Sequence, residues 1–264
     1  MENDSLIRLA VFIGLFVLFA TLEAWAPRRQ RTQPRGGRWV TNWAIVVIDT
    51  LALRALALAM PLLAVGAALD AKAQGWGLMN ALDMPLWINI LATVLVFDFA
   101  IWLQHLITHK VPVLWRIHRV HHADRDIDVT TAIRFHPVEI ALSMLVKIGL
   151  VYLLGPPAAG IVLFEIILNG TAMFNHANLR LPLPLDAALR RVLVTPDMHR
   201  VHHSDRRDEH DSNYGFALSV WDRLFGTYVP QPDKGHEGMT IGLQWQDDRP
   251  SRLGWTLGLP FRRK

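Results

Sequence analysis

Cysteine is absent from this chain of 264 residues. Its absence excludes disulfides, thiolate zinc sites, cysteine catalysis and iron–sulfur clusters held by thiolates. A Gly-rich dinucleotide-binding loop is missing as well. Any redox chemistry of this chain therefore needs electrons from a separate protein.

Charged residues are few. They make up 19% of the chain, whereas hydrophobic residues make up 52% and the mean hydropathy is +0.23. This composition is too apolar for an ordinary soluble domain and predicts an all-α, polytopic membrane helical bundle. A membrane span needs about 20 apolar residues. Five stretches are candidates for spans: residues 9–25, 39–69, 86–106, 140–154 and 158–173.

Acidic residues are absent from the loop between Arg28 and Arg38, which contains five arginines. By the positive-inside rule this loop lies in the cytoplasm. Gly155-Pro156-Pro157 interrupts the last apolar run and predicts a hairpin between two spans. The polar tail begins at Arg180 and contains 13 Lys and Arg. Counting spans from the arginine loop places this tail and every histidine cluster on the cytoplasmic side.

The chain as a whole is basic, with a sequence pI of about 9.8. Its basic residues lie beside the apolar stretches rather than on an aromatic-rich binding face. We therefore expect anionic lipid headgroups, and no nucleic acid, as their partners. The expected location is the membrane that bounds the cytoplasm, such as the inner membrane of a bacterium.

Histidine, by contrast, is concentrated in three clusters. Successive residues of an α-helix are about 100° apart, so one helix face can present the two or three imidazoles of a cluster. Eight imidazoles exceed the roughly four ligands of one zinc ion, and their number predicts two metals. Imidazole suits iron, zinc, copper and nickel, so ligand type alone leaves the metal open. The clusters are His105 and His109; His118, His121 and His122; and His199, His202 and His203.

The residues before the third cluster predict the start of a helix. Thr195 suits the N-cap and Pro196 suits the first helical position. The remaining histidines are interpreted as structural where they stand alone, as His236 does. His210 lies in a run of charged residues, and we expect it on the solvated surface.

Six segments between about residues 95 and 230 resemble the fatty acid hydroxylase superfamily, the integral membrane oxygenases that include sterol desaturases and fatty acid hydroxylases. The first two boxes are separated by eight residues, which favours this superfamily over the acyl desaturases. The segments are HLITH (105–109), HRVHH (118–122), TAIRFHPVE (131–139), FNHANL (174–179), TPDMHRVHH (195–203), and DSNYG followed by WDRLFGTY (211–228).

The resemblance implies a di-iron centre that faces the cytoplasm and uses molecular oxygen to oxidise a C–H bond of a lipid. Two irons per chain are the implied cofactor, and zinc can replace them in purified protein. The eight clustered histidines are implied ligands, with His176 as a ninth. His136 is a further implied ligand, whereas Ala172 occupies a place where some members have histidine.

Polar residues near the clusters are candidates for supporting roles. Asp98 precedes His105 by two helical turns and is expected to orient its imidazole. Asp211, Asn213 and Tyr214 follow the last box, and the family pattern makes them candidates for hydrogen bonds to ligands. We therefore count Asp98, Asp211 and Asn213 as candidate catalytic residues.

Four further charged residues are placed in or near the apolar stretches. Glu139 and Glu165 are candidates for carboxylate neighbours of the metals and not for ligands, and Glu139 equally suits the start of a helix after Pro137. Asp49 and Arg54 are expected to pair with each other or with neighbouring helices, because an isolated charge in a span is costly.

The predicted organisation is one membrane domain, 1–264. It contains N-terminal transmembrane helices in residues 1–90, the catalytic region in 95–230 and a cytoplasmic tail in 231–264. We expect an iron-dependent lipid monooxygenase, a hydroxylase or desaturase, acting on a sterol, a fatty acyl chain or another apolar lipid. Its external electron donor would be a ferredoxin, a cytochrome or a reductase that docks on the basic tail.

Two other functions fit the histidines less well. A zinc-dependent lipid hydrolase would use a metal-bound water, and it would work without oxygen. A metal transporter would place ionisable residues along a path at mid-membrane depth. Here the histidine clusters gather at one membrane face, so transport ranks last.

Overall fold

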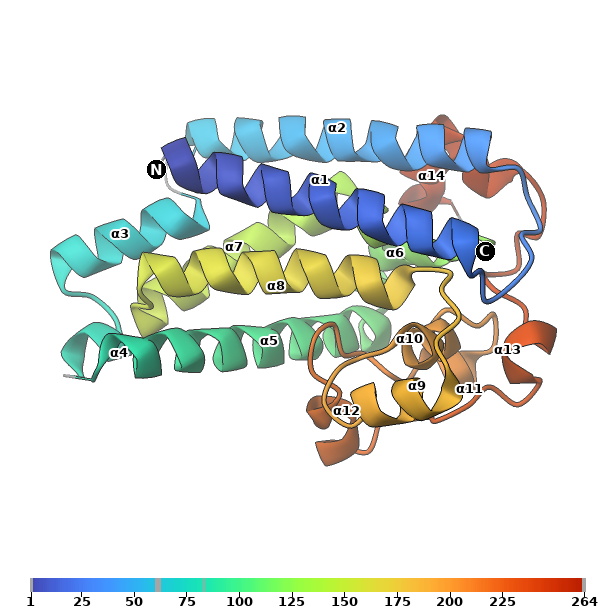
Figure 1. Cartoon of the computed structure of the whole chain (residues 1–264). Helices are drawn as coiled ribbons and strands as arrows, with labels where there is room; N and C mark the ends of the chain where they lie inside the picture. The colour runs from blue at the N-terminus through green and yellow to red at the C-terminus, as the bar shows by residue number, and fades with distance from the viewer. Residues whose placement is uncertain (1, 60–62, 83, 263–264) are drawn as a thin grey trace.

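The computed structural model describes residues 2–59, 63–82 and 84–262. In these residues the regular structure is helical, and β-type pairing is confined to three isolated bridges. The five longest helices lie side by side (Figure 1), and the predicted all-α bundle is confirmed. These helices are long and apolar enough to cross a membrane: α1 (Glu2–Trp25), α2 (Arg35–Ala59), α5 (Leu86–Lys110), α7 (Pro137–Leu154) and α8 (Ala158–His176).

The outer faces of the long helices are apolar. Leu9, Val17 and Leu58 are each more than half exposed, and large apolar surfaces of this kind are rare on soluble proteins. Inside the bundle, α5 and α1 pack on α8, and α2 packs on α7. Phe97 and Phe164 lie in the core between them. This distribution suits a lipid bilayer as the surrounding medium.

The second apolar stretch is divided between two helices rather than forming one run. A separate helix, α3 (Ala64–Gln74), follows α2. Its 11 residues make about 16 Å of helix, which is too short to cross a bilayer. Ala64, Ala67, Ala68 and Ala71 form a small buried face, and α3 packs against α7 and α8. The apolar composition of α3 therefore serves close packing.

The predicted hairpin between α7 and α8 is confirmed. Its C-cap is Gly155, with a φ of 63° in the left-handed region. The turn packs closely on the segment between α3 and α4 (Leu78–Ala81), because a Cβ at Gly155 would lie 2.5 Å from the carbonyl oxygen of Trp76. Only glycine fits this approach. The hairpin closes the end of the bundle that is remote from the histidines.

The polar C-terminal part covers the opposite end of the bundle, where α1 ends and α2 begins (Figure 1). There α5 leads into α6 (Pro112–His122), and α8 ends at His176. All three histidine clusters come to this end, as predicted. The short elements here are η1 (Thr131–Ile133), α9 (Leu183–Leu189), α10 (Pro196–His202), α11 (Arg207–His210), α12 (Val220–Leu224), α13 (Gly235–Gly238), η2 (Arg249–Ser251), α14 (Leu253–Gly258) and η3 (Leu259–Phe261).

A buried ion-pair network ties the start of α2 to the segment after α6. Arg38 donates to Asp124 at 2.6 Å and to Asp128 at 2.8 Å, and all three side chains are almost fully buried. Arg28 similarly bonds Asp197 at 3.2 Å, beside the third histidine cluster. The arginine loop therefore lies next to the histidine clusters, and part of its positive charge is neutralised within the fold.

Candidate metal centre

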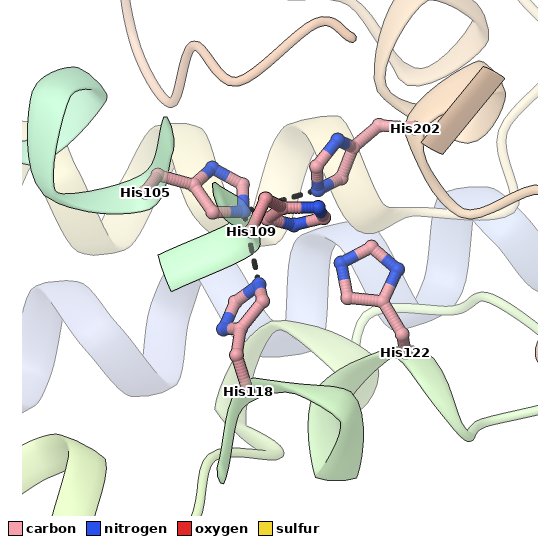
Figure 2. Close-up of side chains that lie close together, drawn as sticks. All are labelled: His105, His109, His118, His122 and His202. Carbon is pink, nitrogen blue, oxygen red and sulfur yellow. Dashed lines mark hydrogen bonds between the residues drawn. The ribbon is translucent and has the colours of Figure 1, made fainter. Parts of the chain in front are cut away.

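Nine buried histidines form two adjacent groups in the described part of the chain. They are the eight clustered histidines together with His176. Figure 2 shows the rings of the larger group converging on one another. Within each group, one ring nitrogen from every member lies within 4.8 Å of the others. The larger group is His105, His109, His118, His122 and His202, and the smaller is His121, His176, His199 and His203.

The period of the α-helix explains why each HxxHH box serves both groups. In α6, His118 and His122 are four residues apart and share one face, whereas His121 turns toward the smaller group. In α10 and its C-cap the assignment is reversed, because the pair four residues apart, His199 and His203, joins the smaller group. Thr195 is the N-cap of α10, as predicted, and accepts from the backbone N–H of Met198.

The outer ring nitrogens of the larger group show where its lone pairs point. Nδ1 of His105 donates to the Tyr214 carbonyl oxygen at 2.8 Å, and Nδ1 of His202 donates to that of Ser212 at 2.6 Å. Because a carbonyl can only accept, both rings, when neutral, have a lone pair on Nε2. These two Nε2 atoms are 3.0 Å apart. Lone pairs at this distance repel each other unless a cation lies between them.

The smaller group repeats this arrangement. Nδ1 of His176 donates to the Ala172 carbonyl oxygen at 2.7 Å, and Nδ1 of His121 donates to that of Arg134 at 3.2 Å. Their Nε2 atoms, again with lone pairs, face each other at 3.1 Å. Nε2 of His199 lies 3.1 Å from Nε2 of His176 on another side. A second cation therefore fits among these rings.

Distances and protonation both fit a metal ion in each group. Two nitrogens bound at about 2.1 Å to one ion, at right angles, lie about 3.0 Å apart, which matches the observed separations. Both ring nitrogens of His122 and of His203 are buried and have no hydrogen-bond partner among the described residues. Burial, reinforced by neighbouring imidazoles, lowers the pKa of these two histidines well below its ordinary value. Their rings are therefore neutral and able to bind metal.

Two carboxylates contact outer nitrogens of the histidine rings. Glu139, in the first turn of α7, accepts from Nδ1 of His118 at 2.6 Å. Asp211 Oδ1 lies 3.4 Å from Nδ1 of His109, and the same carboxylate binds Lys110 Nζ at 2.9 Å. Contacts of this kind orient a ligand ring and raise the basicity of its metal-facing nitrogen.

Asp98 and Asn213 lie away from the ring nitrogens. The carboxylate of Asp98 accepts from Trp221 Nε1 at 2.8 Å and does not orient His105. Two helical turns separate Asp98 from His105 by about 10 Å along the axis, so sharing a face does not bring them into contact. Asn213, with a φ of 49°, donates its amide to the Met198 carbonyl oxygen at 2.9 Å. Asp98 therefore fixes a tryptophan side chain, and Asn213 fixes backbone.

His136 stands outside both groups, and its two ring nitrogens are already used. Nδ1 accepts from the backbone N–H of Val138 as the N-cap of α7, and Nε2 lies 3.2 Å from the Leu257 carbonyl oxygen. Ala172 contributes through its backbone, because its carbonyl oxygen receives Nδ1–H of His176. Among the described residues, nine histidines therefore surround the centre.

The expectation that His210 is solvated was wrong. Its side chain is buried, its ring stacks on Trp115 with centroids 5.2 Å apart, and its Nδ1 lies 3.1 Å from the Ser204 carbonyl oxygen. The short helix α11 turns His210 and the preceding Glu209 inward, whereas Arg207 and Asp208 at its start remain exposed. The charged residues around His210 in the sequence therefore gave no indication that its ring is buried.

Asp222 is a buried residue that sequence reasoning missed. It is fully buried and accepts from Trp102 Nε1 at 3.0 Å and from the backbone N–H groups of Tyr214 and Gly215, each at 2.8 Å. Since the Tyr214 carbonyl oxygen accepts from His105, Asp222 holds the peptide that orients this histidine ring. The sequence feature that could have indicated this role is that Asp222 is the one acid in the segment WDRLFGTY.

A cavity of about 310 Å³ reaches the larger histidine group from among the long helices. Its walls include the rings of His105 and His118 and apolar side chains of the spans, such as Phe12, Leu53 and Leu168. The cavity therefore joins apolar side chains of the long helices to the rings of the larger group.

Replacing Glu139 with alanine is expected to weaken metal binding by the larger group about 10- to 100-fold, because His118 loses the partner that orients it. Glu139→Gln keeps an acceptor oxygen and should lose less. Glu237→Ala, which removes a carboxylate that is 74% exposed, is the matched control. The measurement is the metal retained by the purified chain against increasing chelator. Equal retention by Glu139→Ala and the control would contradict this role.

The sequence profile of the fatty acid hydroxylase family matches residues 90–227, a range that contains all nine histidines. The chain belongs to this family. Membership of this family of membrane enzymes, together with five apolar helices, makes it an integral membrane protein. No solved structure matches the chain significantly.

Three relatives illustrate the match. Alkylglycerol monooxygenase is 32% identical over 153 residues in Xenopus tropicalis and 31% over 148 residues in Homo sapiens. Ornithine lipid hydroxylase OlsE of Rhizobium tropici is 28% identical over 159 residues. These alignments cover 56%, 54% and 59% of this chain, but 32%, 31% and 47% of the relatives. The chain therefore aligns with less than half of the length of each relative.

Proposed function

We propose that this chain is an oxygen-dependent hydroxylase that uses two irons to oxidise a C–H bond of a membrane lipid. The observation that carries the proposal is the pair of histidine groups, in which Nε2 lone pairs converge at 3.0 and 3.1 Å. The larger group borders an apolar cavity between the long helices. The printed names of the relatives, a monooxygenase of alkylglycerols and a hydroxylase of ornithine lipids, support the reaction class and a lipid substrate.

The reaction inserts one oxygen atom into a C–H bond of the lipid and releases the other as water, with the uptake of two electrons and two protons. Bound iron, which imidazole ligands suit, supplies the redox chemistry for this step. The chain holds the ligand rings in place. Glu139 fixes His118, and Phe135 stacks on the ring of His121 with centroids 4.4 Å apart. The apolar cavity walls keep water from the reacting part of the lipid.

The cytoplasm is the proposed side of the metal centre. The arginine loop bonds directly to residues beside the histidine clusters, as Arg28 does with Asp197 and Arg38 with Asp124. The positive-inside rule assigns such loops to the cytoplasm. A membrane bounding the cytoplasm, such as a bacterial inner membrane, is the location that this orientation supports.

A separate protein is the proposed source of electrons, because the chain has no cysteine for an iron–sulfur cluster and no Gly-rich dinucleotide loop. A second cavity, of about 340 Å³, lies on the polar side against the ligand His109. Its lining contains three cations, Lys110, Arg119 and Arg207, and two acids, Asp205 and Asp211. The small excess of positive charge suits an acidic donor such as a ferredoxin.

Activity driven by reduced ferredoxin should fall with rising salt, because screening shortens the reach of surface charges to about 3 Å at 1 M. Arg207→Glu, at a position that is 81% exposed, should raise the KM for ferredoxin about tenfold at low salt. Arg252→Glu, on an exposed residue outside this cavity, is the control. Steady-state rates at several salt concentrations provide the measurement. Salt-independent turnover, or equal KM values for both variants, would count against docking here.

Comparative lipid mass spectrometry tests the proposed reaction. Cells producing the wild-type chain should accumulate a lipid with one added oxygen, and cells producing His121→Ala with His202→Ala should not. The product should also be missing from cells kept without oxygen. A product that forms equally well without oxygen would instead favour hydrolysis by a metal-bound water.

A further inference from the structure

The cavity beside the larger histidine group contains an acid that the proposed reaction does not use. Asp49 lies in α2, lines this cavity and is 8% exposed. Its Oδ1 atom is buried without a hydrogen-bond partner among the described residues. An unpartnered carboxyl group within a membrane span is costly and commonly marks a functional position.

Arg54 is not the partner that the sequence led us to expect. Arg54 is the fifth residue after Asp49, which places the two side chains about 140° apart around the helix. In the structure Asp49 points into the bundle, whereas Arg54 is exposed. The described ion pairs of the chain do not include one between them. The carboxyl group of Asp49 is therefore directed at the cavity.

Apart from the histidines, the described side chains that line the cavity include acids and neutral polar groups but no basic residue. Glu139 lines the same cavity but is already bonded to Nδ1 of His118. Gln104, Ser143 and Asn169 add neutral polar groups to the wall. Lysine and arginine are absent from the described residues that line it. A lipid carboxylate or phosphate beside Asp49 would meet two acids and no lysine or arginine, whereas a hydrogen-bond donor would satisfy Asp49.

We propose that Asp49 determines substrate specificity by accepting a hydrogen bond from a donor group of the lipid, either a hydroxyl or a protonated amine. The proposal rests on the function proposed above and names the class of substrate: a lipid whose inserted part carries such a donor and no negative charge. A site built to bond a polar group discriminates against analogues that lack the group, because its buried acceptor is then left unpaired.

Three probes with the same alkyl chain test this specificity. They are a hexadecyl glyceryl ether with free hydroxyls, the same ether with both hydroxyls methylated, and hexadecylamine. Binding to the full-length, iron-loaded chain in detergent is measured without oxygen, so that the result does not depend on turnover. The wild-type chain should bind the free ether or the amine at least about tenfold more tightly than the methylated ether.

Asp49→Ala should abolish this preference while retaining the wild-type iron content. Because it removes an unpartnered buried carboxyl group, it should also unfold at a temperature no lower than the wild-type chain. Asp49→Asn separates the two donor types: binding of a hydroxyl should survive within about fivefold, whereas binding of an amine should fall about tenfold or more. Asp70→Ala is the matched control, since Asp70 bonds Tyr152 and does not line the cavity.

Equal binding of all three probes by the wild-type chain, or an unchanged preference in Asp49→Ala, would overturn the proposal. Tightest binding of hexadecanoate, an anionic probe of the same chain length, would overturn it as well. If only the proposed hydroxylation is wrong, the wild-type chain should still prefer the probes with a donor group, but no lipid should be oxidised in an oxygen-dependent way.

Discussion

His202→Ala is expected to lower the metal content of the purified chain from two ions to one and to reduce lipid oxidation at least about 100-fold. Loss of a residue that merely supports a ligand costs about 10- to 100-fold in affinity or activity, and His202 is a proposed ligand itself. Its Nε2 lies 3.0 Å from that of His105, in the larger group. His199→Ala should remove the other ion, because Nε2 of His199 lies 3.1 Å from that of His176 in the smaller group.

His136→Ala is the matched control for both variants. Its ring nitrogens cap α7 and face the Leu257 carbonyl oxygen, outside both groups. This variant should therefore keep two ions per chain, although it loses the cap of α7 and with it about 1 kcal/mol of stability. Metal analysis of the three purified variants makes the comparison. Loss of an ion from His136→Ala, or retention of both ions by His202→Ala, would show that the nine-histidine assignment is incorrect.

Arg38→Ala is expected to destabilise the fold by about 3–5 kcal/mol, because it leaves Asp124 and Asp128 buried without their cation. For a chain of this size the loss corresponds to a fall of about 10 °C in the unfolding temperature. The network also borders the centre, since Asp124 follows His122 by two residues. Metal content should therefore fall together with stability. Thermal unfolding in detergent, followed by circular dichroism, provides the measurement.

Arg252→Ala is the control for burial. Arg252 also bonds an aspartate, Asp248, at 2.6 Å, but both side chains are about two-thirds exposed. Exposed pairs contribute about 0–1 kcal/mol, so the unfolding temperature should hardly change. Similar unfolding temperatures for the two variants would contradict the idea that the buried network holds the start of α2 to the metal centre.

Much of the centre could be predicted from local patterns. Histidines four residues apart share a helix face, and Thr195 with Pro196 marks the start of α10. The hairpin at Gly155 followed from glycine and proline chemistry. His176 was implied by the family resemblance alone, since a single histidine carries no spacing signal. The larger and smaller groups follow from the helical period only once the facing helices are known.

Features that depend on contacts distant in sequence could not be predicted. Arg38 and Asp124 are 86 residues apart, so the arginine resembled a loop charge until the fold paired it. Asp98 and His105 share a helix face, but Trp221, far along the chain, takes the carboxylate. The separate helix α3 was not predicted, because small apolar residues that pack inside a bundle have the same hydrophobicity pattern in the sequence as residues that face lipid. Likewise, the sequence could not predict that Asp49 has a buried oxygen without a hydrogen-bond partner, because this depends on the residues around the cavity.

Isotope-labelled oxygen gas tests the central claim most directly. Membranes containing the iron-loaded chain, their native lipids and reduced ferredoxin are incubated under labelled oxygen in unlabelled water, and the lipids are analysed by mass spectrometry. The account predicts a hydroxylated lipid whose new oxygen carries the label, and no such product with His202→Ala. A product oxygen that comes from water, or a product that forms without oxygen gas, would contradict it.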